Sequence, residues 1–225
     1  MYLKKSKMVS KDFVRYILDL AAENLARISY QKRRREIFTL PLNAEAIGWL
    51  GLNIATQGRG PGVLEINPVV GVRHQELERL VSELSGIKAH EYIPPSISTN
   101  VGYLMPEKKY KPWLFQERDE YEALVAGMVS TVEKFGRPFM ERNAELSILY
   151  ETMRELGVAD DLNYRLPVAC VLLGRKVEAE VFLDAKLTEM GGRTDQAAND
   201  FVKFATSLRR ASTAGTLRIG TTKSR

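Results

Sequence analysis

Residues 47–84 read IGWLGLNIATQGRGPGVLEINPVVGVRHQELERLVSEL, and this stretch decides the fold. Two short apolar runs flank a turn that contains three glycines, residues 58–62, and an amphipathic segment, residues 73–84, follows at once. Glycine supplies the positive φ angles that tight hairpin turns require. The stretch therefore predicts a β-hairpin followed directly by a helix, which is the beginning of an α+β core.

The two apolar runs alternate in the way that half-buried strands do. Leu50, Leu52 and Ile54 are separated by small or polar residues, and Leu64 and Ile66 repeat this spacing in the second run. The glycines do not form a phosphate-binding loop, because no Gly-Lys-Ser/Thr follows and the turn joins two strands. After the hairpin, four apolar residues recur at helical spacing: Leu77, Leu80, Val81 and Leu84.

The rest of the chain adds strands before residue 117 and helices after it. We expect an α+β fold, with an antiparallel sheet of about four to six strands covered by helices and a helical C-terminal third. The expected strands outside the hairpin are residues 37–41, residues 96–105 and a short one near residue 115. The expected helices are residues 11–28, a segment from 117 that closes at 136–138, a segment from 146 that ends at Gly157, and residues 168–173, 178–190 and 195–210.

We expect one domain over residues 8–210. Its first part, residues 10–116, combines a helix with the sheet, and its second part, residues 117–210, is helical and packs on the first. Residues 1–7 and 211–225 are basic, and residues 211–225 are also rich in threonine, serine and glycine, so we expect both segments to be flexible tails.

The positive charge of the chain is concentrated at its ends. The formal net charge is +5, but residues 1–7 carry three lysines and no acid, and residues 209–225 carry five basic residues and no acid, which leaves −3 for residues 8–208. No apolar run approaches the ~20 residues needed to cross a bilayer, so we expect no membrane segment. The single cysteine, Cys170, excludes an intramolecular disulfide and favours the reducing cytoplasm.

The usual catalytic residue sets are missing from the sequence. It has only two histidines, His74 and His90, and Cys170 lies in an apolar run typical of a buried, inert thiol. No nucleophile elbow, dinucleotide-binding fingerprint or EF-hand loop occurs. We therefore predict no catalytic residues, no cofactor and no metal.

One enzymatic alternative stays open, a magnesium-dependent nuclease. Asp184 and Lys186 form an acid-x-lysine triplet, and Asp160 and Asp161 lie upstream. In nucleases of the restriction-endonuclease type such a triplet lies on a strand, where carboxylates hold the metal and the lysine positions water. The periodicity of residues 178–190 fits a helix better than a strand, which counts against this alternative.

An interaction protein is the leading hypothesis. Residues 90–113 are rich in prolines, lysines and aromatic residues, and aromatic side chains in such loops are typical contact anchors. The predicted partner-binding residues are Tyr92, Lys108, Lys109, Tyr110, Lys111 and Trp113. The partner is expected to be another protein, and self-association is left open.

Nucleic-acid binding is the second hypothesis. The densest basic run in the body of the chain is Lys32, Arg33, Arg34 and Arg35. These residues could contact phosphates together with the basic tails. The alternative reading is a solvated edge strand, because lysine and arginine at a sheet edge discourage aggregation.

The segment GWLGLNIATQGRGPGVLEINPVVGVR, residues 48–73, and the order of elements around it resemble uncharacterised bacterial α+β domains. Some of these domains accompany contact-dependent toxins as immunity proteins. The resemblance covers roughly residues 10–156 and rests on pattern without a catalytic motif. It implies a cytoplasmic protein that neutralises a toxin by tight binding.

Overall fold

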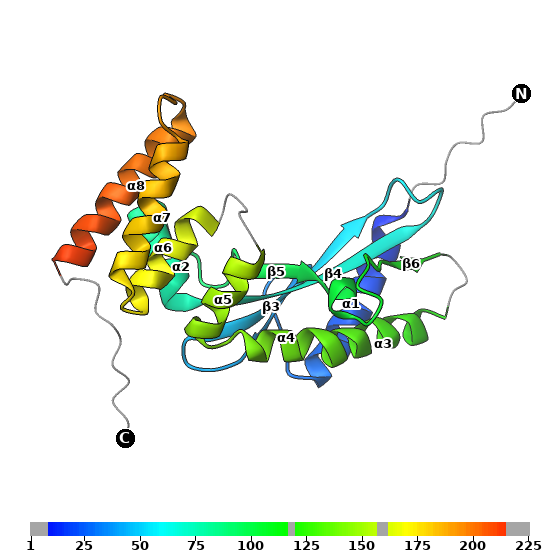
Figure 1. Cartoon of the computed structure of the whole chain (residues 1–225). Helices are drawn as coiled ribbons and strands as arrows, with labels where there is room; N and C mark the ends of the chain where they lie inside the picture. The colour runs from blue at the N-terminus through cyan, green and yellow to red at the C-terminus, as the bar shows by residue number, and fades with distance from the viewer. Residues whose placement is uncertain (1–8, 117–119, 157–161, 215–225) are drawn as a thin grey trace, which may run out of the picture. The chain divides into compact units, whose positions relative to one another are not determined.

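The hairpin expected from residues 47–84 forms strands β3 (Ala46–Ala55) and β4 (Leu64–His74) of the computed structural model (Figure 1). The structure describes residues 9–116, 120–156 and 162–214, so the expected tails, 1–7 and most of 211–225, lie outside the described residues. Contacts divide the chain into two compact units. The first comprises residues 1–73 and 97–144, and the second comprises residues 74–96 and 145–225.

The first unit contains an open antiparallel sheet of six strands, at the upper end of the expected range. The order is β1-β2-β3-β4-β5, and β6 also pairs with β4. Its remaining strands are β1 (Gln31–Lys32), β2 (Ile37–Pro41), β5 (Ile97–Asn100) and β6 (Trp113–Phe115). Three pairs fix the register: Phe38 with Leu50, Val70 with Thr99, and Ile66 with Trp113. The turn glycines Gly58, Gly60 and Gly62 have positive φ, as the hairpin interpretation requires.

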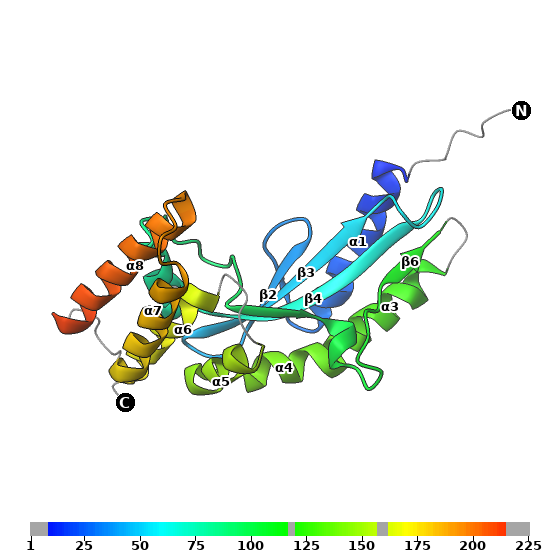
Figure 2. The ribbon, with the colours of Figure 1, turned by 45° about the horizontal axis from the view of Figure 1, so that its top comes forward.

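Helices cover one face of this sheet (Figure 2). They are α1 (Lys11–Arg27), α3 (Tyr121–Thr131), a π-helical turn η2 (Val132–Gly136) and α4 (Arg137–Arg142). A Cβ atom on Gly48 of β3 would lie 2.6 Å from the sulfur of Met140, and one on Gly136 would lie 2.9 Å from Val70. Sheet and helix layer are therefore in direct contact. The core between them includes the fully buried side chains of Leu50, Leu52, Ile66 and Val70.

Two expectations for this unit are wrong. The strand expected over residues 96–105 ends at Asn100, because the Asn100 side chain accepts the N–H of Gly102 and caps a 3₁₀ turn, η1 (Val101–Leu104). The helix from residue 121 does not stop at Gly136 but continues through η2 into α4. Pro138 lies in the first turn of α4, directly after the π-helical turn, where the regular hydrogen-bond ladder of the helix is already interrupted.

The second unit is helical. Its helices are α2 (Gln75–Leu84), α5 (Leu146–Leu156), α6 (Leu162–Leu172), α7 (Lys176–Glu189) and α8 (Gln196–Thr213). The other four helices all pack against α6, which is mostly apolar and largely buried, and whose buried residues include Arg165. The helix expected to begin at Val168 begins at Leu162 and includes Pro167. No helix in the described part of the chain combines the length and the apolar character needed to span a membrane.

Candidate functional site

The acid-x-lysine triplet lies on a helix, so the strand that the nuclease alternative needs is absent. Asp184 and Lys186 both belong to α7. Asp184 accepts a hydrogen bond from Arg209 at 2.6 Å, and Lys186 donates to Glu189 at 2.8 Å. Asp160 and Asp161 lie outside the described residues. Among the residues that are described, no three His, Cys, Asp or Glu side chains come together as a metal site.

Cys170 is fully buried in α6, as its apolar neighbours predict. Burial raises the pKa of its thiol, which keeps the thiol protonated at neutral pH. The nearby Tyr150 hydroxyl donates to Glu178 at 2.5 Å, and the Arg175 guanidinium lies 4.8 Å from the centre of the tyrosine ring. These contacts tie α5 to α7 and are structural.

The predicted partner-binding residues are divided between the two units. Tyr92 belongs to the second unit, where its half-buried ring meets His90 edge-on at 4.4 Å. The other residues follow η1 in the first unit. Trp113 pairs with Ile66 in the sheet and is only 9% exposed, so its side chain is mainly part of the core. Tyr110 is 40% exposed, and the three lysines are exposed.

The structure adds two apolar side chains to the exposed lysines and Tyr110. Tyr103 in η1 is 51% exposed, and Leu114 in β6 is 41% exposed. Leu114 points away from the core because strand residues alternate, with Trp113 and Phe115 inward. We call the resulting set the basic–aromatic surface; it comprises Tyr103, Lys108, Lys109, Tyr110, Lys111 and Leu114. A cavity of about 300 Å³ is lined by Lys109, Tyr110 and Lys111 together with Gly102 and Glu107.

Close backbone packing holds this surface in place. A Cβ atom on Gly102 would lie 2.8 Å from the Lys111 nitrogen and closer still to the Lys109 carbonyl oxygen, so only glycine fits beneath the loop. Lys108 adopts the left-handed conformation, with φ 45°, which turns the chain back over η1. The Lys111 ammonium lies 5.6 Å from the centre of the Trp113 ring.

A charged cluster anchors Tyr110 to the sheet. Its hydroxyl donates to Glu65 at 2.5 Å, and the Arg59 guanidinium of the hairpin turn donates to the other oxygen of the same carboxylate. Hydrogen bonds from Arg59 and Tyr110 lower the pKa of Glu65, and the bond to Glu65 raises the pKa of Tyr110. At neutral pH an ionised Glu65 therefore accepts from a neutral Tyr110.

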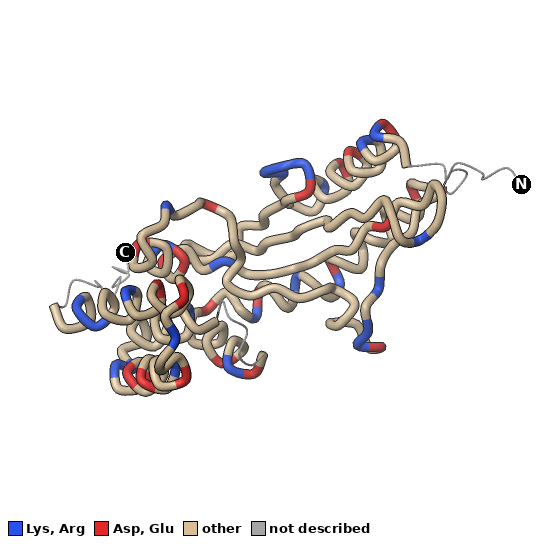
Figure 3. The backbone as a smooth tube through the Cα atoms, turned by 90° about the horizontal axis from the view of Figure 1, so that it is seen from above, with Lys and Arg blue, Asp and Glu red and all other residues tan. Residues whose placement is uncertain are grey.

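The basic run Lys32–Arg35 lies at the β1 edge of the same sheet, where Lys32 ends β1 and the three arginines follow in the β1–β2 turn (Figure 3). All four side chains are exposed, but they have partners within the protein. Lys32 donates to Asp19 at 3.2 Å, Arg33 donates to Thr39 at 2.8 Å, and Arg35 lies 3.8 Å from Glu36. These contacts fit the reading of a solvated edge better than that of a dedicated phosphate site.

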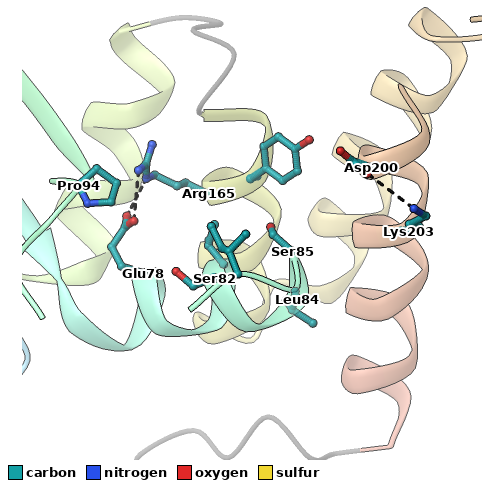
Figure 4. A pocket seen from close by; sticks show the side chains of 11 residues that line it. Glu78, Ser82, Leu84, Ser85, Pro94, Arg165, Asp200 and Lys203 are labelled. Carbon is teal, nitrogen blue, oxygen red and sulfur yellow. Dashed lines mark hydrogen bonds and ion pairs between the residues drawn. The ribbon is translucent and has the colours of Figure 1, made fainter. Parts of the chain in front are cut away.

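A larger cavity, of about 420 Å³, belongs wholly to the second unit (Figure 4). It is bounded by the end of α2, by α6 and by α8. A buried ion pair forms one side: the Arg165 Nε and Nη2 atoms donate to the two oxygens of Glu78 at 2.6 and 3.2 Å. Its α8 side carries Asp200 and Lys203, which lie 3.7 Å apart. The residue spacing in the sequence gave no signal for this cavity.

Comparison of the chain with family models, curated proteins and solved structures finds no match.

Proposed function

We propose that the chain is a cytoplasmic, non-enzymatic protein-binding module whose contact site is the basic–aromatic surface. The observation that carries this proposal is the exposure of Tyr103, Tyr110 and Leu114 together with three exposed lysines within residues 103–114. Half-exposed aromatic side chains contribute strongly to interfaces because they bury a large area with few rotatable bonds. The surrounding lysines select the partner by its charge.

The basic–aromatic surface is held by contacts within the protein, which supports the proposal. Its backbone packs on Gly102, and Tyr110 is held by Glu65, so little conformational freedom is lost when a partner binds. Residues 107–111 contain three lysines and one glutamate, Glu107, so the segment carries a net positive charge. This balance favours an acidic patch on the partner, which would also raise the rate of association.

The test begins with a pull-down from the cell of origin, followed by a measured Kd for the captured protein with purified variants. Tyr103→Ala and Leu114→Ala should each weaken binding at least about tenfold, equivalent to about 1.4 kcal/mol. The matched controls are Tyr16→Ala and Val202→Ala, since Tyr16 and Val202 are 48% and 49% exposed and lie outside the surface. Equal loss in test and control variants would reject the proposed surface.

Charge reversal tests the preference for an acidic partner. Lys109→Glu should weaken binding and reduce its dependence on salt, because a favourable long-range attraction is lost. Lys11→Glu changes the net charge equally at another exposed position of the first unit and serves as the control. Tighter binding by Lys109→Glu would contradict the expected charge of the partner.

The more specific form of the proposal is a bacterial immunity or regulatory protein that neutralises a toxin by direct binding. It is supported by the pattern of elements in residues 10–156 and by the exposed contact surface. Co-expression with a toxin-like protein encoded beside it should restore growth, and Tyr103→Ala should abolish that protection. Protection that survives both surface variants would contradict the mechanism.

The nucleic-acid alternative is favoured by one observation, the exposure of four consecutive basic residues, Lys32 to Arg35, at the end of β1 and in the turn that follows it. Phosphate contacts make log affinity fall linearly with log salt, with a slope near −0.9 for each phosphate contact on duplex DNA. A steep slope for duplex DNA that becomes shallower in Arg34→Gln would favour this alternative. Removal of residues 1–7 and 211–225 tests the contribution of the tails.

A further inference from the structure

The cavity of the second unit has apolar walls and polar ends. Val81 and Leu84 of α2, Ile87 after it and the ring of Tyr164 form the walls. The Tyr164 ring is held by edge-on contacts with Phe201 at 5.4 Å and Phe204 at 4.8 Å. Ile87 is 62% exposed, so the wall continues to the outer surface. Such walls accommodate a flexible apolar stem better than a compact polar molecule.

The charged side chains around the cavity cancel. Arg165 is neutralised by Glu78 through two hydrogen bonds, and Lys203 lies 3.7 Å from Asp200. The first pair is almost fully buried, whereas both members of the second are exposed and able to exchange partners. The remaining electrostatic preference therefore depends on the backbone.

The C-terminal end of α2 supplies that preference. Leu84 and Ser85 line the cavity, and their carbonyl groups accept no hydrogen bond from any residue that the structure describes. α2 has no basic residue in its last turn to offset the partial negative charge of about −0.5 at a helix C-terminus.

We infer that this cavity binds the side chain of an arginine or lysine from a partner protein. The aliphatic stem lies along Val81, Leu84 and Ile87, while the cation meets the free carbonyl groups of α2 and Asp200. The Tyr164 ring adds a cation–π contact. The statement that this residue belongs to a protein rests on the proposed function, whereas the preference for a cation with an apolar stem does not.

The cavity can be tested with capped amino acids on the full-length protein. N-acetyl-arginine amide is titrated into protein with isotopically labelled methyl groups, and shifts of the Val81, Leu84 and Ile87 signals are followed by NMR. Three probes of similar size provide the comparison: the capped amides of citrulline, norleucine and glutamate. We expect a millimolar Kd for arginine and at least tenfold weaker binding of citrulline, which keeps the shape but lacks the charge.

Variants on α8 test the direction of the charge effect. Asp200→Asn should weaken arginine binding about threefold or more, and Lys203→Gln should strengthen it by removing a competing cation. Glu189→Gln removes the same charge from an exposed position that does not line the cavity, so it should leave the Kd unchanged. Equal effects of Asp200→Asn and Glu189→Gln would show non-specific attraction and overturn the inference.

The remaining outcomes also decide the question. Binding of norleucine or glutamate as tight as that of arginine, or no shift with any probe at 20 mM, would overturn the inference. A partner that loses affinity for Tyr103→Ala but not for Asp200→Asn would support the proposed function and reject the role of the cavity. Binding of the arginine probe by a protein for which the pull-down captures no partner would support the role of the cavity and count against the proposed function.

Discussion

The buried pair between Glu78 and Arg165 offers the sharpest test of what holds the second unit together. Their side chains are 2% and 7% exposed, and two hydrogen bonds join α2 to α6. Glu78→Gln leaves a buried guanidinium without its counter-charge, and Arg165→Met leaves a buried carboxylate. Removal of one member of such a pair costs about 3–5 kcal/mol.

The double variant Glu78→Leu/Arg165→Met has a different expected result. Removing both charges leaves neither one unpaired, so its free energy of unfolding should lie within about 1 kcal/mol of wild type or exceed it. The two single changes should therefore be strongly non-additive, with a coupling energy of about 3 kcal/mol or more. This coupling energy, and not the stability lost in either single variant, measures the strength of the interaction between Glu78 and Arg165.

Urea unfolding followed by two signals provides the assay. Both tryptophans, Trp49 and Trp113, belong to the first unit, so their fluorescence reports on the sheet, whereas circular dichroism at 222 nm also follows the helices of the second unit. With a urea slope of about 2 kcal/mol per molar, the single variants should lower the midpoint by about 1.5–2.5 M. Single losses below about 1 kcal/mol, or a double variant as unstable as the sum of the singles, would refute this reasoning.

Three further variants test other contacts. Gly102→Ala forces a methyl group against the backbone of Lys109, so the first unit should lose about 1–3 kcal/mol and the fluorescence midpoint should fall. Tyr150→Phe removes the hydroxyl that donates to Glu178, whose side chain is 35% exposed and can bind water instead, so circular dichroism should show a loss near 1 kcal/mol. The folded-state pKa of Glu65 lies below its ordinary value of 4.5, so the stabilisation that ionised Glu65 provides is complete above pH 4.5 and is lost as pH falls through the lower folded-state pKa. Acid unfolding curves of Glu65→Gln should lack this loss. Identical curves for Glu65→Gln and the wild type would contradict the prediction.

The sheet of the first unit was largely predictable because its strands carry local signals. The alternation of Leu50, Leu52 and Ile54 and the glycines of the turn are enough to define the hairpin, and β6 appears where a short strand was expected. The end of β5 was not predictable from alternation, since the side chain of Asn100 caps a 3₁₀ turn at that point. Capping by one side chain competes successfully with a weak strand pattern.

The assignment of α2 to the second unit required information that local periodicity does not contain. Its apolar face follows the hairpin directly, but the helix packs against α6 and α8 of the second unit. The partner of Glu78 is 87 residues away in the sequence. The candidate surface was partly visible from the lysines and Tyr110, whereas Leu114 could have been recognised only from its position between two inward aromatic residues of β6.

The separation of Glu78 from Arg165 also has a consequence during protein synthesis. At about 5–20 residues per second, the ribosome needs roughly 4–17 s to add the 87 residues between them. Throughout that interval the apolar face of α2 has emerged without the helix that later covers it. A chaperone that binds nascent chains should therefore protect residues 74–96 until α6 emerges, and premature termination before residue 162 should yield an aggregation-prone product.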